Sequence, residues 1–131
     1  FPKNLHKEIQ VVVTCLSWDG QNDPDLMGLL AASIALSISD IPWQGPLAVL
    51  RIGQLNNEFI LNPTYEEREK SPFDFLFAGP EPDLINMIEM EGAEKDEETV
   101  LKAWQFAKPY SKKLLDLQEE IIKKTGKEKS N

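Results

Sequence analysis

A pair of asparagines joins two β-rich segments, and this gives the sequence its strongest local constraint. Residues 47–55 and 58–61 are rich in aliphatic side chains, and Asn56-Asn57 stands between them. Asparagine tolerates the positive φ that a two-residue hairpin turn requires. The two segments are therefore predicted to pair as antiparallel strands.

Three further segments are predicted to be strands. Residues 73–77 and 84–90 flank the turn sequence Gly79-Pro80-Glu81-Pro82 and form a second pair. Residues 8–16 are a β-branched run that is apolar at both alternating positions, as in a strand covered on both faces. The lone cysteine, Cys15, lies in this run and is expected to be buried. The charged residues 65–71 are predicted to be a connection.

A first helix is predicted to begin at Asp23-Pro24-Asp25 and to run to about Ser39. Asp23 can act as N-cap, Pro24 suits the first helical position, and Asp25 favours the positive end of the helix dipole. The expected core face consists of Leu26, Leu29, Leu30, Ile34 and Ile38. A face of small residues, Gly28, Ala31, Ala32 and Ala35, would let another element come close.

A longer amphipathic helix is predicted from Asp96 to near Gly126. Pro109 lies inside it and is expected to kink or split it near Ala107, because the proline ring removes a backbone hydrogen bond and clashes with the previous turn. The polar residues 127–131 are expected to form a mobile tail. The predicted order is thus β-α-β-β-β-β-α, an α+β fold with two helices on a mostly antiparallel sheet.

The charge distribution weighs against independent binding to nucleic acid. The 131-residue chain has a formal charge of −8, whereas such binding needs lysine and arginine to neutralise phosphates. The lysines near the C-terminus are interpreted as a solvated helix end, with weak RNA-contact candidates at Lys123, Lys124 and Lys127 as the alternative. The longest apolar stretch, residues 26–38, is too short to span a bilayer, which needs about 20 residues.

Several motifs occur in the order and spacing of a known family. They are Asn22-Asp23-Pro24-Asp25-Leu26, Ala31-Ala32-Ser33, Ser39-Asp40-Ile41-Pro42-Trp43-Gln44-Gly45-Pro46, Arg51-Ile52-Gly53, Asn57 to Thr64 and Phe75 to Gly79. Together they resemble the first ribonuclease PH-like core of polynucleotide phosphorylases, which shorten RNA from its 3′ end with phosphate. The motif residues expected to be structural are Asn22, Asp23, Pro24, Asp25, Asp40, Pro42, Gly45, Pro46, Arg51 and Gly53.

The resemblance also divides the chain and gives it a role. Residues 1–93 would be the C-terminal half of the first core, residues 94–126 the helix leading into the family's linker, and residues 127–131 a polar tail. The segment would be a non-catalytic scaffold within a homotrimer that encloses RNA, in the cytoplasm of a bacterium or in an organelle. Its nearest partner would be the second core of the same chain, and no membrane is implied.

Catalysis in this family is implied for the second core, which uses magnesium and inorganic phosphate. That core carries an Asp-x-x-x-Asp-x-Asp-x-Lys-x-Ala-Gly pattern, and this chain has Arg68, Pro72, Asp74 and Leu76 at the four functional positions. One carboxylate beside an apolar residue makes a poor divalent site. No catalytic residue, metal ligand or cofactor is therefore predicted in this segment. Asp74 is interpreted as structural, with a residual metal ligand as the alternative.

Two other readings stay open at this point. The chain could be a stand-alone interaction module that kept the fold without the activity, or a ribonuclease PH or exosome-ring subunit, which the motif wording fits less well. Isolated reactive residues add little, because His6 has no serine or cysteine partner at a recognised spacing and Cys15 has no second thiol.

Overall fold

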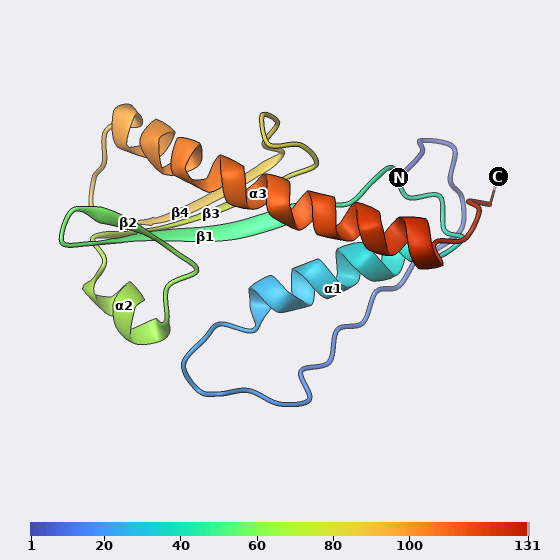
Figure 1. Ribbon diagram of the computed structural model, residues 1–131, viewed down its shortest axis with the longest axis horizontal. Coiled ribbons are helices and arrows are strands. Elements are labelled where there is room, and N and C mark those ends of the chain that lie inside the picture. Colours follow the sequence, from blue (N-terminus) through green and yellow to red (C-terminus); the bar gives the residue numbers. More distant parts are fainter. Residues whose placement is uncertain (131) are drawn as a thin grey trace.

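The chain folds into a four-stranded antiparallel sheet with helices packed on it. The computed structural model describes residues 1–130. Its elements are α1 (Asp25–Ile38), β1 (Ala48–Leu55), β2 (Glu58–Leu61), α2 (Tyr65–Lys70), β3 (Phe73–Gly79), β4 (Met87–Gly92) and α3 (Glu97–Thr125). The strand order is β2-β1-β3-β4, and every neighbouring pair is antiparallel (Figure 1). The predicted α+β class with a long C-terminal helix is confirmed.

The predicted asparagine hairpin is confirmed. Leu55 pairs with Glu58 at its end, and Asn56 and Asn57 have φ values of 50° and 66°. Positive φ at both central residues matches the right-handed twist of the flanking strands. The second hairpin also forms, but its outer strand covers Met87–Gly92 instead of 84–90. The turn before it is longer than predicted: Leu84 N–H donates to Glu81 O within the turn, and Asn86 N–H donates to Ala78 O where the two strands begin to pair.

The main core lies between the sheet and the N-terminal half of α3. Phe73, Phe75 and Phe77 project from β3 on this face and pack with Ala103 and Ala107 of the helix. The Phe73 and Phe75 rings stack at 4.1 Å, and Trp104 lies 5.4 Å from the ring of Phe77. Small residues on α3 let the helix approach the three rings closely. Burying side chains of this size contributes most of the stability of such a layer.

The opposite face of the sheet carries a smaller apolar cluster and α1. Leu26 of α1 packs with Val49, Leu76 and Ala78, whose side chains alternate with those of the main core. The C-terminal half of α3 extends past the sheet and lies beside α1 (Figure 1). The two helices therefore join the two faces of the sheet at one end of the molecule.

The prediction of a strand at residues 8–16 is wrong, and so is the predicted burial of Cys15. The segment has no partner strand among residues 1–130, and all of residues 10–16 are exposed, including Cys15. It follows α1 as an extended chain, and Val13 Cγ1 lies 3.2 Å from the point where a Cβ on Gly28 would stand (Figure 1). A β-rich run needs a neighbouring strand and a covering layer before it becomes a strand.

The first helix is confirmed, but its start and its buried face differ from the prediction. Pro24 is the N-cap and offers no side-chain hydrogen bond, while Asp23 before it accepts from Asp25 N–H through Oδ1 at 3.3 Å and turns Oδ2 towards Arg68. Leu29 is exposed rather than part of the core. The buried positions are Leu26, Ser33 and Ser37.

The segment predicted as a connection, residues 65–71, contains the short helix α2. Thr64 and Glu67 form a capping box, in which the Thr64 hydroxyl accepts from Glu67 N–H and the Glu67 carboxylate accepts from Thr64 N–H. This pairing satisfies two donors that a helix start leaves free. The observed order is therefore α-β-β-α-β-β-α, with α2 added and the first predicted strand absent.

The long helix runs without interruption from Glu97 to Thr125, so the predicted split at Pro109 does not occur. Packing of Ala103 and Ala107 on the sheet holds the turns on the N-terminal side of Pro109. Asp96 and Gly126 cap the helix as predicted. Among residues 1–130, no helix combines the length and the apolar character needed to cross a bilayer.

The tail lies against the end of α1, and its mobility stays a prediction. Lys127 N–H donates to Ile38 O at 3.0 Å and Ser130 N–H donates to Asp40 O at 2.7 Å. Asn131, the last residue of the predicted tail, lies outside the described residues.

Candidate functional site

A cluster of five charged side chains occupies the α1 face of the sheet. We call it the arginine–aspartate cluster, and its members are Asp23, Asp25, Arg51, Arg68 and Asp74. They come from the start of α1, from β1, from α2 and from β3. Four separate segments of the chain therefore meet at this point.

Arg51 is the centre of the cluster. Its Nη1 donates to Asp74 Oδ2 at 2.6 Å, and its Nη2 donates to Asp25 Oδ2 at 2.5 Å and lies 3.7 Å from Asp23 Oδ2. The Arg51 side chain is only 10% exposed. Its backbone is fixed as well, because Arg51 N–H donates to Asn62 Oδ1 and Arg51 O accepts from Asn62 N–H.

Arg68 closes the cluster from the other side. Its Nη1 donates to Asp23 Oδ2 at 2.7 Å, and its Nη2 lies 2.7 Å from Asp74 Oδ2. The capping box of α2 sets the position of this arginine, since it fixes the helix on which Arg68 stands. Each of Asp23 and Asp74 thus faces both guanidinium groups.

Electrostatics favour the charged forms of Asp23 and Arg51. Burial disfavours the charge on Asp23, but the backbone N–H of Asp25 and the two guanidinium groups outweigh it and hold the pKa of Asp23 below its ordinary value. Burial alone would lower the pKa of Arg51, but the hydrogen bonds and negative charges of Asp74 and Asp25 outweigh burial and raise this pKa above its ordinary value. The cluster is therefore a set of ion pairs at neutral pH.

The cluster does not fit a divalent metal ion. Asp74 is the only carboxylate at the four pattern positions, its Oδ2 already receives two guanidinium contacts, and Leu76 offers no ligand, so a magnesium ion would find one free oxygen beside two positive charges. Across residues 1–130, no group of three or more histidine, cysteine, aspartate or glutamate side chains is arranged to hold a metal. Asp74 Oδ1 and Arg51 Nε are buried without a hydrogen-bond partner in this part of the chain.

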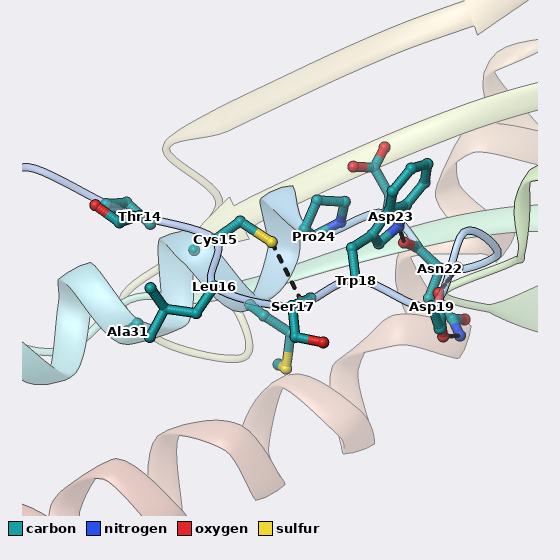
Figure 2. Close-up of a pocket in the computed structure, with 13 residues that line it drawn as sticks. Thr14, Cys15, Leu16, Ser17, Trp18, Asp19, Asn22, Asp23, Pro24 and Ala31 are labelled. Carbon is teal, nitrogen blue, oxygen red and sulfur yellow. Dashed lines mark hydrogen bonds between the residues drawn. The ribbon is translucent and has the colours of Figure 1, made fainter.

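A hollow of about 580 Å³ lies beside the cluster, between the extended segment 13–24 and α1 (Figure 2). Trp18 is one of its lining residues, and Figure 2 shows it beside Asn22, to whose backbone oxygen Trp18 Nε1 donates at 2.6 Å. The Cys15 thiol also points to this region and donates to Ser17 O at 3.3 Å. The thiol has no histidine beside it, so the hollow lacks the nucleophile and base that covalent catalysis needs.

The remaining residues of the predicted motifs lie apart from the cluster. Asn22 is held by Asp19, which accepts from both its backbone and its side-chain nitrogen. Asp40, Pro42, Gly45 and Pro46 form the loop between α1 and β1, where Gly45 has a φ of 131°. Gly53 faces Pro63 and Ser71, where a Cβ would approach both at 3.2 Å.

The candidate RNA-contact lysines do not converge on a site. Lys123 is 75% exposed and lies 3.8 Å from Glu119, one turn away on α3. Lys124 stands on the same last turn, and Lys127 uses its backbone N–H to reach α1. Their role in RNA contact stays a prediction.

Besides the ion pairs of the arginine–aspartate cluster, sequence reasoning missed two sets of long-range contacts. Gln118 is fully buried, where its Oε1 accepts from Ser33 Oγ at 2.7 Å and its Nε2 donates to Leu47 O at 3.0 Å. Lys129 Nζ donates to the carbonyl oxygens of Leu36, Ser37 and Ser39 at 2.9, 2.9 and 2.7 Å. The last turn of α1 has no basic residue of its own, and this was the one sequence signal that a lysine from elsewhere could bind the carbonyl groups at its end.

Comparisons with known proteins agree with this architecture. Residues 45–109 match the 3′ exoribonuclease family, domain 2. The chain is 45% identical over 129 residues to the polyribonucleotide nucleotidyltransferase of Thermus thermophilus, an alignment that covers 98% of this chain and 18% of the relative. The corresponding protein of Deinococcus deserti is 43% identical over 131 residues, which covers 100% of this chain and 18% of the relative.

The fold has a counterpart among solved structures. The crystal structure of rice Rrp46 superposes with a TM-score of 0.69 at 16% identity, and the match covers 79% of this chain and 50% of that chain. The chain spans about a fifth of the length of the curated relatives it matches.

Proposed function

We propose that this chain belongs to the 3′ exoribonuclease family, whose domain 2 matches residues 45–109, and that it is a non-catalytic scaffold segment of an enzyme that degrades RNA phosphorolytically from the 3′ end. The relatives that match nearly its whole length are named polyribonucleotide nucleotidyltransferases. Such an enzyme releases nucleoside diphosphates with phosphate as the attacking group. The segment would carry none of this chemistry itself.

The proposal rests on one observation, which is that Asp74 forms ion pairs with two arginines. Of the four functional positions in the pattern that the resemblance implies for a catalytic core, only this one holds a carboxylate here. Its Oδ2 is contacted by Arg51 and Arg68 at 2.6 and 2.7 Å. Arg68 itself stands at the first of those positions, so a cationic side chain replaces a carboxylate. The same place in the fold therefore supports ion pairing instead of metal-assisted phosphoryl transfer.

Packing supports the scaffold role. The arginine–aspartate cluster joins α1, β1, α2 and β3, and Gln118 joins α3 to α1 and to the start of β1. These contacts connect segments that are distant in the sequence, since Ser33 and Gln118 are 85 positions apart. A rigid segment of this kind can hold a neighbouring catalytic core in position.

The remaining features of the enzyme are part of the same proposal. We expect the complete protein to contain a second, catalytic core that uses magnesium and inorganic phosphate, to assemble as a homotrimer around RNA, and to act in the cytoplasm. The acidic charge of this segment fits a structural place in such an assembly better than a place on the RNA path.

The direct test is a phosphorolysis assay on the 131-residue chain with poly(A), phosphate and magnesium. The expected result is no release of ADP above a blank reaction. Release that persists through purification and disappears in Asp74→Ala would overturn the proposal, because it would show that the remaining carboxylate supports turnover.

A further inference from the structure

The outer edge of β4 is a free strand edge with an unusual distribution of side chains. β4 pairs with β3 on one side, and it is the last strand of the sheet on the other (Figure 1). All six of its residues are exposed. No segment of residues 1–130 pairs with this outer edge.

The hydrogen-bond register shows which backbone groups point outward. Ala93 N–H donates to Pro72 O at 3.3 Å, next to the pairing of the two strands. Bonding alternates along an antiparallel ladder, so Glu89 and its second neighbours direct their N–H and C=O groups to β3. The backbone groups of Ile88 and Met90 therefore point away from the sheet. They are free to pair with another extended chain.

Side chains on one face of β4 continue the main core without a cover. Ile88 pairs with Phe77 and Met90 pairs with Phe75, so both lie on the face that carries the core phenylalanines. α3 packs on the β3 phenylalanines and comes closest to β1 and β2, on the side of the sheet away from β4. As a result Ile88 and Met90 are 53% and 55% exposed, although they extend a buried layer.

The opposite face of β4 is acidic. Glu89 and Glu91 alternate with the two apolar residues, and both are exposed. A second copy of this chain, paired antiparallel along β4, would bring these glutamates against their own counterparts, which is unfavourable. The formal charge of −8 opposes such self-pairing further. The complementary chain is one with basic residues on that face.

We propose that the outer edge of β4 binds an extended peptide segment in which basic residues alternate with large apolar residues. The segment would add a fifth strand, with its backbone bonded to Ile88 and Met90. Its apolar side chains would cover these two residues, and its lysines or arginines would face Glu89 and Glu91. Exposed strand edges with apolar side chains are the surfaces that take up an added strand.

The test uses a synthetic capped peptide in which lysine alternates with isoleucine, together with two control peptides and one control variant of the protein. The first control peptide has the same composition with its lysines grouped together, and the second is N-methylated at every second residue. The protein variant is Met90→Pro, which removes one outward N–H donor of β4 without touching a hydrogen bond to β3. Binding is measured by calorimetry, and amide exchange is followed by NMR. We expect the alternating peptide to slow exchange at Ile88 and Met90 but not at Glu89.

Loss of backbone pairing should weaken binding about tenfold or more, in the N-methylated peptide and in Met90→Pro alike. Equal binding of the grouped-lysine peptide would overturn the proposal, because charge attraction alone would then explain it. Equal binding of the N-methylated peptide would overturn it too, and this result does not depend on the folding of any variant. Self-association that Met90→Pro abolishes, seen by sedimentation, would instead identify a second copy as the occupant and would also refute the proposal.

Discussion

Replacing Arg51 with methionine should destabilise the protein by about 3 kcal/mol. Arg51 is 10% exposed and contacts Asp74 at 2.6 Å and Asp25 at 2.5 Å. Methionine keeps the apolar stem but removes the charge, which leaves carboxylates facing one another. Removing one partner of a buried ion pair typically costs about 3–5 kcal/mol.

The lower end of that range applies for two reasons. Asp74 is 15% exposed and retains Arg68 Nη2 at 2.7 Å, so it keeps one cationic partner. Asp25 is 40% exposed and can be hydrated once Arg51 is gone. The loss therefore arises mostly from Asp74 and from the repulsion between the carboxylates.

Urea unfolding, followed by circular dichroism and tryptophan fluorescence, measures the change. Lys112→Met is the matched control, because Lys112 is 64% exposed in its ion pair with Asp116 and should change stability by less than about 0.5 kcal/mol. Adding Asp74→Leu to Arg51→Met should cost less than the sum of the two single changes. A loss below about 1 kcal/mol in Arg51→Met, or fully additive effects, would refute the view that the cluster joins the fold.

Further predictions concern acid stability, one buried amide and the tail. The folded state lowers the pKa of Asp23, so the ionised Asp23 stabilises the fold above its unfolded-state pKa. The free energy of unfolding should therefore fall as the pH drops below about 4, and Asp23→Asn should make this fall less steep. An unchanged pH dependence in Asp23→Asn would contradict this role of Asp23. Gln118→Ala should cost about 2–3 kcal/mol in urea unfolding, because Leu47 O and a serine hydroxyl lose a buried partner. Lys129→Met should speed amide exchange in residues 127–130, whereas Lys124→Met should not, and equal behaviour of the two variants would disprove the tail contact.

Local signals in the sequence predicted the elements that depend on neighbouring residues. The Asn56-Asn57 turn requires only positive φ at two adjacent positions, and Asp96 and Gly126 cap α3 by contacts within a few residues. The same kind of signal was available for α2, since Thr64 followed by Glu67 is a capping-box pattern. That helix was missed because its charged composition was interpreted as a connection.

Predictions that depend on distant partners were less successful. Residues 8–16 have the composition of a covered strand, but no strand and no second layer meet them in the described chain. The motifs marked Asp23, Asp25 and Arg51 without indicating that they pair. The approach of Lys129 to the end of α1 requires α3 to bring the tail back across the molecule, and no local pattern encodes that path.

The most direct test of the scaffold role is a chimera. This chain replaces the segment that aligns with it in the Thermus thermophilus polyribonucleotide nucleotidyltransferase, to which it is 45% identical. We predict that the chimera phosphorolyses poly(A), and that Asp74→Ala within the inserted segment leaves the rate per folded molecule unchanged while lowering the melting temperature. A rate that falls in Asp74→Ala while the protein stays fully folded would contradict the account, because it would place Asp74 in the chemistry of the enzyme.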